Sequence, residues 1–255
     1  MNIFIVTKKQ LGMFLLVMVF ISTAVVASFA MNKVDFTATI PKKLPIYAVN
    51  TEEKKIALTL DCAWENSDTQ TLIELFEKNS IKATFFMTGD FCERYPDDVK
   101  LIYAKGHAIE NHSYNHPHVA SISAEKLLED TNKCDEIIMN LTGKKPTLYR
   151  APYGEYSNSM LDTFEKSLQH KVIQWDVDSI DWKGREAPEM VETVIKKVKN
   201  GSIILFHNDT KNTPQALEQI IPQLKGEGYE FVLVNDLIYQ DNFRLDHEGR
   251  QVKLP

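Results

Sequence analysis

Short apolar runs alternate with longer amphipathic stretches between residues 56 and 234. The runs predict strands because they are too short for buried helices, and the stretches between them space their apolar residues as helices do. The predicted strands are 56–60, 82–87, 107–111, 147–150, 171–177, 202–206 and 229–234, and the predicted helices are 68–79, 97–106, 123–143, 157–168, 188–201 and 213–228. This alternation predicts a parallel sheet with helices outside it, either closed as a barrel or open and doubly wound.

The first thirty residues follow a different pattern. Lys8 and Lys9 precede a stretch from Leu11 to Ala30 that has no charged residue. Such a stretch is long enough to span a bilayer and exceeds the usual core of a signal peptide. We therefore expect a membrane anchor, or a signal peptide cleaved after Ala30. In either case the remainder should lie outside the cytoplasm, anchored or secreted, because the lysines stay inside.

The rest of the chain divides into three parts. Residues 31–53 are polar and contain lysine and proline, which suggests a linker. Residues 54–240 form the predicted domain. Residues 241–255 are polar and without periodicity, so they form either a strap or a disordered tail.

Charge and cysteine content narrow the functional classes. The net charge of -6 argues against a nucleic-acid partner, which needs a basic surface. No GxGxxG follows a predicted strand, so dinucleotide binding has no support. Three cysteines cannot all pair within one chain. Cys92 and Cys134 could pair, but we expect all three to be reduced and partly buried.

Reactive side chains follow the predicted strands where each strand ends. Asp61, His112, Arg150, Asp178 and His207 end or directly follow five of the seven apolar runs. The carboxyl ends of parallel barrel strands share one rim, and active sites form there. The positions therefore predict one catalytic site.

The segment HSYNH, residues 112–116, is the sharpest local signal. Two imidazoles four residues apart can reach one ion, and neutral imidazole is a common metal ligand. Pro117 disfavours a helix at His116, so we place the pair on a turn. The alternative is a surface loop with scattered histidines. Asp61 and His207 follow other predicted strands and could reach the same site, which favours metal binding over this alternative.

Two further segments carry candidate chemistry. RAPYGEY, residues 150–156, offers an arginine that can hold a carboxylate through two hydrogen bonds, or else only a turn built on Pro152 and Gly154. DSIDW, residues 178–182, offers two acidic side chains and a tryptophan that could form one wall of a binding pocket. The alternative is a purely structural capped loop whose tryptophan packs in the core.

The motifs TLDC, HSYNH, RAPYG, DSIDW and LFH, in this order between residues 54 and 239, resemble the polysaccharide deacetylases of the NodB-homology type, carbohydrate esterase family 4. The sporulation-type members of spore-forming bacteria look most similar. The resemblance implies a distorted (β/α) barrel of about seven parallel strands and a divalent metal, zinc first and cobalt or nickel as alternatives. It also implies hydrolysis of N-acetyl groups from a cell-wall glycan, peptidoglycan or chitin-like, by a protein that we expect to be a monomer.

The resemblance also assigns roles to individual residues. By position, Asp61 matches the catalytic base and His207 the general acid. The remaining matches are Arg150, which orients the base; Asp181, which tunes the acid; His112 and His116, which bind the metal; Tyr153, whose backbone N–H contacts the oxyanion; and Trp182 and Leu205, which line the pocket. We add Asp178 as a substrate-binding candidate.

Cys62 departs from the family pattern, which has a metal-binding aspartate at this position. Three interpretations follow: the thiolate binds the metal, the two histidines hold it with water or Asp61, or the site binds no metal and is inactive. The last interpretation supports a rival function, a sugar-binding or wall-assembly protein that retains the fold. A metal-dependent hydrolase acting on another amide or ester is a third possibility.

Overall fold

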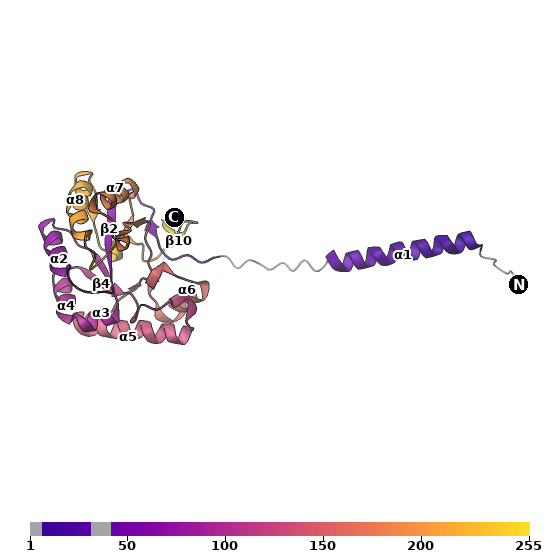
Figure 1. Ribbon diagram of the computed structural model, residues 1–255, viewed down its shortest axis with the longest axis horizontal. Helices are drawn as coiled ribbons and strands as arrows, with labels where there is room; N and C mark the ends of the chain where they lie inside the picture. Colours follow the sequence, from indigo (N-terminus) through magenta and orange to yellow (C-terminus); the bar gives the residue numbers. More distant parts are fainter. Residues whose placement is uncertain (1–6, 32–41) are drawn as a thin grey trace. The chain divides into compact units, whose positions relative to one another are not determined.

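The computed structural model describes residues 7–31 and 42–255. The chain divides into two units at Pro41, and each is treated by itself. The first contains helix α1, Lys8–Met31 (Figure 1). Across the described residues, no helix combines the length and apolar character needed to cross a membrane. The signal peptide or anchor predicted for residues 1–30 stays a prediction.

A parallel sheet forms the centre of the second unit. Its strand order is β6-β5-β4-β3-β2-β8-β7, with β9 also beside β2. Every pairing in it is parallel, as expected of strands separated by helices. The strands are β2 Lys55–Cys62, β3 Thr84–Met87, β4 Ala108–Asn111, β5 Leu148–Tyr149, β6 Lys171–Val172, β7 Val177–Asp178, β8 Ile203–His207 and β9 Glu230–Phe231.

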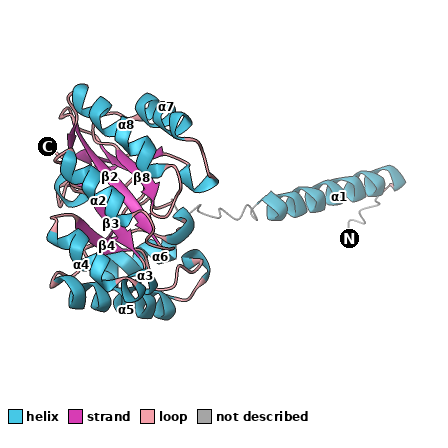
Figure 2. Cartoon of the chain, turned by 60° about the vertical axis from the view of Figure 1, so that its left-hand side comes forward, coloured by secondary structure: helices cyan, strands magenta, loops and turns pink. Residues whose placement is uncertain are grey.

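Helices surround this sheet (Figures 1 and 2). Their apolar faces and the outer faces of the strands form the largest buried cluster, in which Phe76, Phe91 and Leu217 are almost fully buried. Burying such side chains is the main stabilising contribution to a domain of this kind. The helices are α2 Thr69–Lys78, α3 Gly89–Arg94, α4 Pro96–Ala104, α5 Ala124–Thr142, α6 Asn158–Thr163, α7 Ala187–Lys197, α8 Thr213–Gly226 and α9 Val234–Leu237.

The two edges of the sheet are parts of one chain segment. Residues 171–177 were predicted as a single strand, yet β6 pairs with β5 while β7 pairs with β8 at the opposite edge. Only residues 173–176 separate them, so the edges lie within about 18 Å of each other along the chain. The sheet therefore curls into a distorted barrel, and the predicted fold class is confirmed.

Helix α5 shows how local sequence sets an element's limits. The hydroxyl of Ser123 accepts a hydrogen bond from the backbone N–H of Lys126, which caps the first turn. Gly143 follows the helix at φ 73°, a left-handed conformation that glycine adopts without strain. Both predicted ends of this helix are confirmed.

The predicted linker over 31–53 is wrong for residues 42–53, because they pack into the folded unit. Ile46 and Ala48 are buried, since β1, Ala48–Val49, pairs with the end of the chain. Residues 32–41 lie outside the described residues. The tail is a strap: β10, Phe243–Leu245, and β11, Arg250–Lys253, form a hairpin, and β11 pairs in parallel with β1.

The predicted strand over 229–234 is also too long. Only Glu230 and Phe231 pair with β2, and Val234 begins the short helix α9. The backbone N–H of Val234 donates to the side-chain hydroxyl of Thr84 on β3 rather than to a backbone carbonyl of a neighbouring strand. This contact between distant parts of the chain overrides the strand propensity of the apolar residues.

The side chain of Glu110 on β4 accepts hydrogen bonds from backbone N–H groups of another segment, as a backbone carbonyl would. Its carboxylate accepts hydrogen bonds from the backbone N–H groups of Thr147 and Leu148 and from the amide of Asn235. The carboxylate is buried, and burial raises its pKa. It therefore ties the start of β5 and the region of α9 to the centre of the sheet.

We expect Glu110→Ala to lower the free energy of unfolding by about 2–4 kcal/mol, because it leaves buried donors without acceptors. Urea denaturation measures this. Glu110→Gln, which keeps one acceptor oxygen, should lose less. Equal losses in the two variants would show that packing volume, rather than hydrogen bonding, is the contribution of this side chain.

Candidate active site

A cavity of about 670 Å³ opens at the carboxyl ends of the strands, as the sequence predicted. It collects side chains from β2, β7 and β8 and from the segments that follow β2, β4, β5, β6, β7 and β8. The lining residues are Asp61, Trp64, His112, His116, Tyr153, Gly154, Trp175, Asp178, Trp182, Leu205, His207, Asp209 and Thr210. Arg150 and Asp181 lie behind this lining and contact it through Asp61 and His207.

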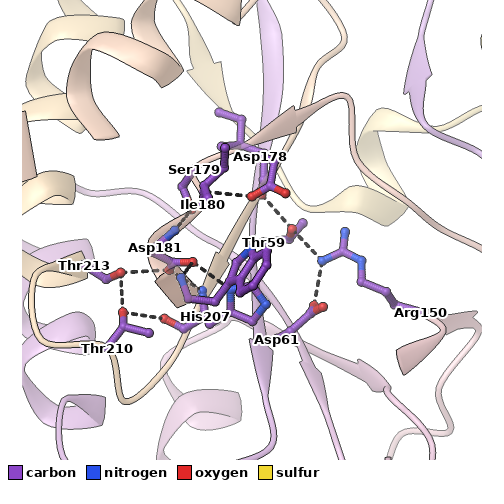
Figure 3. Close-up of polar contacts among 12 residues, drawn as sticks. Thr59, Asp61, Arg150, Asp178, Ser179, Ile180, Asp181, His207, Thr210 and Thr213 are labelled. Atoms are coloured by element: carbon purple, nitrogen blue, oxygen red, sulfur yellow. Dashed lines mark hydrogen bonds and ion pairs between the residues drawn. The ribbon is translucent and has the colours of Figure 1, made fainter. Parts of the chain in front are cut away.

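Asp61 is a buried carboxylate held by a buried arginine (Figure 3). Arg150 Nη1 lies 2.7 Å from Asp61 Oδ1 and 2.8 Å from the hydroxyl of Thr59, two residues earlier on the same face of β2. Burial by itself raises the pKa of Asp61, but the charge of Arg150, helped by His112 and His207, outweighs it and lowers the pKa. Asp61 is therefore ionised and able to accept a proton.

His207 ends β8 and lies opposite Asp61 in the register of the neighbouring strands. Its Nδ1 lies 2.7 Å from Asp181 Oδ1, and its backbone N–H donates to the other oxygen of the same carboxylate (Figure 3). Burial alone lowers the pKa of His207, but the hydrogen bond and charge of Asp181 outweigh burial and raise it. Thr213 holds Asp181 with a further hydrogen bond.

The rings of His112 and His116, the two histidines of HSYNH, both line the cavity. They contact each other edge to face, with centroids 5.0 Å apart. His112 Nδ1 lies 2.8 Å from the carbonyl oxygen of Arg150, so this nitrogen carries the hydrogen and donates it. The other nitrogen, Nε2, is left with a lone pair 3.7 Å from Asp61 Oδ2. Burial lowers the pKa of both histidines, that of His116 to about 4. Both rings are therefore neutral, and each has a nitrogen lone pair that can bind a metal ion.

Cys62 lies away from this cavity. Successive residues of a strand point to opposite faces, so Asp61 faces the cavity and Cys62 faces the helices. Cys62 packs in the large apolar cluster, and burial, with the nearby Asp68 and Asp61 charges, raises its pKa well above the usual range. All three cysteines are free, as expected, and they are fully rather than partly buried. Among the described residues, no group of three or more His, Cys, Asp and Glu side chains forms a candidate metal site.

The predicted substrate-binding residues are all part of the cavity lining. They are Tyr153, Trp182, Leu205 and Asp178. The ring of Tyr153 stacks on that of His118, with centroids 4.3 Å apart. Sequence reasoning missed five lining residues, although each lies within three residues of a predicted site residue: Trp64, Gly154, Trp175, Asp209 and Thr210.

Strained backbone conformations gather at this rim. Ser113, His116, Tyr153, Ile180 and Asp209 all have φ between 54° and 68°, in the left-handed region that side chains other than glycine seldom adopt. At Tyr153 this conformation lies within the RAPYG turn. Such conformations persist only where the surrounding structure holds them, which is typical of functional sites.

Comparisons with known proteins agree with this geometry. A family model described as polysaccharide deacetylase matches residues 48–172. The peptidoglycan-N-acetylmuramic acid deacetylase PdaA of Bacillus subtilis is 32% identical over 210 residues, 81% of this chain and 80% of that protein. A peptidoglycan-N-acetylglucosamine deacetylase of Bacillus cereus is 35% identical over 182 residues, 70% of this chain and 66% of that protein.

A solved structure adds a second kind of relative. It is a mutant, with restored enzymatic activity, of a pseudoenzyme of carbohydrate esterase family 4 from Bacillus anthracis. It superposes with a TM-score of 0.74 at 29% identity and covers 82% of this chain and 73% of that one. The fold, the order of the motifs and these relatives together show that the chain belongs to the polysaccharide deacetylase family.

Proposed function

We propose that this chain removes N-acetyl groups from peptidoglycan by hydrolysis, with Asp61 as base and His207 as acid. One observation carries the proposal: an ionised carboxylate and an imidazole with a raised pKa occupy paired positions on neighbouring strands of one cavity. Amide hydrolysis needs both, because water must lose a proton and the departing amine must gain one.

The donors present suit a divalent metal in part. His112 and His116 offer neutral nitrogen atoms to the cavity, and Asp61 adds a carboxylate beside His112. Nitrogen and oxygen donors of this kind suit zinc. We propose that the two histidines hold the ion, with water or Asp61 completing its coordination, and that the buried thiol of Cys62 takes no part. When bound, a divalent ion would polarise the acetamide carbonyl and acidify water.

The protein's own groups then account for each proton. Asp61 accepts a proton from the attacking water, and Arg150 holds this carboxylate in place and ionised. The new C–O bond places negative charge on the former carbonyl oxygen, toward which we assign the backbone N–H of Tyr153. His207 gives its proton to the amide nitrogen as the C–N bond breaks. The products are acetate and a free amino sugar.

Charge at the cavity favours one of the two sugars of peptidoglycan. The lining described above contains no lysine or arginine, whereas Asp178 and Asp209 add negative charge to it. Wherever its peptide stem has been removed, N-acetylmuramic acid carries a free lactyl carboxylate, which these acids would repel, whereas N-acetylglucosamine carries no charge. We therefore propose N-acetylglucosamine as the residue that is deacetylated, in agreement with the name of the B. cereus relative rather than that of PdaA.

The inactive, sugar-binding alternative rests on Cys62. This chain has a thiol that faces the core at the position of the family's metal-binding aspartate, so it lacks that ligand, and one relative is described as a pseudoenzyme. The deciding experiment measures acetate release by residues 42–255 from peptidoglycan and from N-acetylglucosamine oligomers, after chelation and with zinc, cobalt or nickel restored. Release with metal supports the enzyme, and no release with any metal from folded protein supports the alternative.

Asp61→Asn should reduce acetate release by about 10²–10⁴-fold, because the site loses its base. The variant leaves Arg150 buried without its partner charge, so urea denaturation must confirm that it folds. Asp97→Asn, the same substitution at an exposed position on α4, is the matched control and should be fully active. Full activity in Asp61→Asn would exclude Asp61 as the base.

Asp181→Asn should lower the pKa of His207, since the carboxylate is what raises it. In the parent protein this pair stabilises the fold fully below about pH 6.5, the unfolded value, and the contribution is lost as pH rises through the raised folded pKa. NMR titration of the imidazole measures the shift. The alkaline limit of acetate release should move to lower pH in the variant, and an unmoved imidazole pKa would contradict the assignment.

Cys62→Ser should leave metal affinity within about threefold of the parent, whereas loss of a true ligand such as His116 should weaken it by more than the 10–100-fold typical of outer contacts. Cobalt titration followed by absorbance measures both. Cys92→Ser, another buried free cysteine, controls for repacking. A large loss in Cys62→Ser but not in Cys92→Ser would make the thiol a ligand.

A further inference from the structure

All three tryptophans of the chain line the cavity. Trp175 packs near the guanidinium of Arg150, so it has a structural partner behind the site. Trp182 is the aromatic pocket-lining residue that the family pattern predicts. Trp64 has neither explanation: it belongs to the stretch TLDCAW, follows Cys62 by two residues, and is 44% exposed.

The indole of Trp64 lies beside the proposed general acid. Its ring centroid is 5.5 Å from that of His207, and the two planes are tilted by 47°. His207 must come within about 3 Å of the amide nitrogen that it protonates. This nitrogen is bonded directly to the sugar ring, so that ring must lie within reach of the Trp64 face.

The loop that carries Trp64 is fixed from the side of α3. Arg94 Nη2 donates to the carbonyl oxygen of Trp64 at 2.7 Å and to that of Ala63 at 3.3 Å. Arg94 is itself held by Asp90, at 2.9 Å from its Nε. A single side chain of α3 thus sets the position of the backbone from which the indole projects.

The same loop is also fixed from the side of β8. Asn208, next to His207, donates from its side chain to the carbonyl oxygen of Glu65. The hydroxyl of Ser67 donates to the carboxylate of Asp209, whose backbone N–H donates to Asp68 at 2.9 Å. The loops of Trp64 and His207 are therefore joined, which holds the backbone positions of these two residues relative to each other.

We infer that Trp64 is a further substrate-binding residue, and that its indole packs against the pyranose ring whose amide nitrogen His207 protonates. The inference rests on the proposed function. The hydrogens on a pyranose face form an apolar surface, and an indole on a held backbone offers a matching one at a smaller cost in conformational entropy than a mobile loop would. Because the contact is made to the ring rather than to the acetyl group, it persists in the amine product.

The test is calorimetric titration of an N-acetylglucosamine oligomer into chelated protein, with acetate monitored so that any turnover is seen. Trp64→Phe keeps an aromatic face, and Trp64→Leu keeps apolar volume without a ring. We expect Kd to rise about tenfold in Trp64→Leu and less than threefold in Trp64→Phe, in line with the contribution of one aromatic contact. Arg94→Gln, which releases the loop, should lie between them.

Steady-state acetate release in metal-restored protein separates this inference from the proposed function. Trp64→Leu should raise KM with little change in kcat, and unchanged melting temperatures confirm folding. Unchanged Kd in Trp64→Leu overturns the inference even where the parent protein releases acetate. A tenfold weaker Kd supports it even where the parent releases none, and the proposed activity alone then fails.

Discussion

The buried pair of Arg150 and Asp61 connects the fold to the site. Arg150 is fully buried and reaches β2 through Asp61 and Thr59, while another of its nitrogens donates to the carbonyl of Gln174 in the segment that closes the barrel. Its own carbonyl accepts from His112 and thereby fixes the orientation of that ring. An unpaired charge at this depth would be strongly destabilising, so the positions of Arg150, Asp61 and His112 depend on one another.

The sequence placed the candidate site residues at one cavity because their positions obey a local rule. Each follows an apolar run, and parallel strands bring the ends of such runs to one rim. The placement of Asp61, His112 and His207 at one cavity could be predicted from this rule alone. The orientation of Cys62 follows from an equally local rule, strand alternation, although likeness to a metal-binding aspartate obscured it.

What the sequence did not predict depends on contacts between distant residues. Trp64 acquires its place through Arg94 and Asn208, which lie 30 and 144 residues away along the chain. The strand predicted over 171–177 is divided because its two ends meet opposite edges of the sheet. The polar tail pairs with β1 through backbone groups, which leave no hydrophobic pattern to read.

That pairing of β1 with β11 has a consequence for the order of folding. Ala48 aligns with Arg250, so one of the first residues of the domain gains its strand partner only when almost the last has been made. During synthesis, the sheet from β2 to β8 can assemble while β1 still has no parallel neighbour. Contacts of such long sequence separation form slowly. The strap therefore cannot pair with β1 until synthesis reaches β11, and a chain released early would carry the candidate site residues on an unfinished domain.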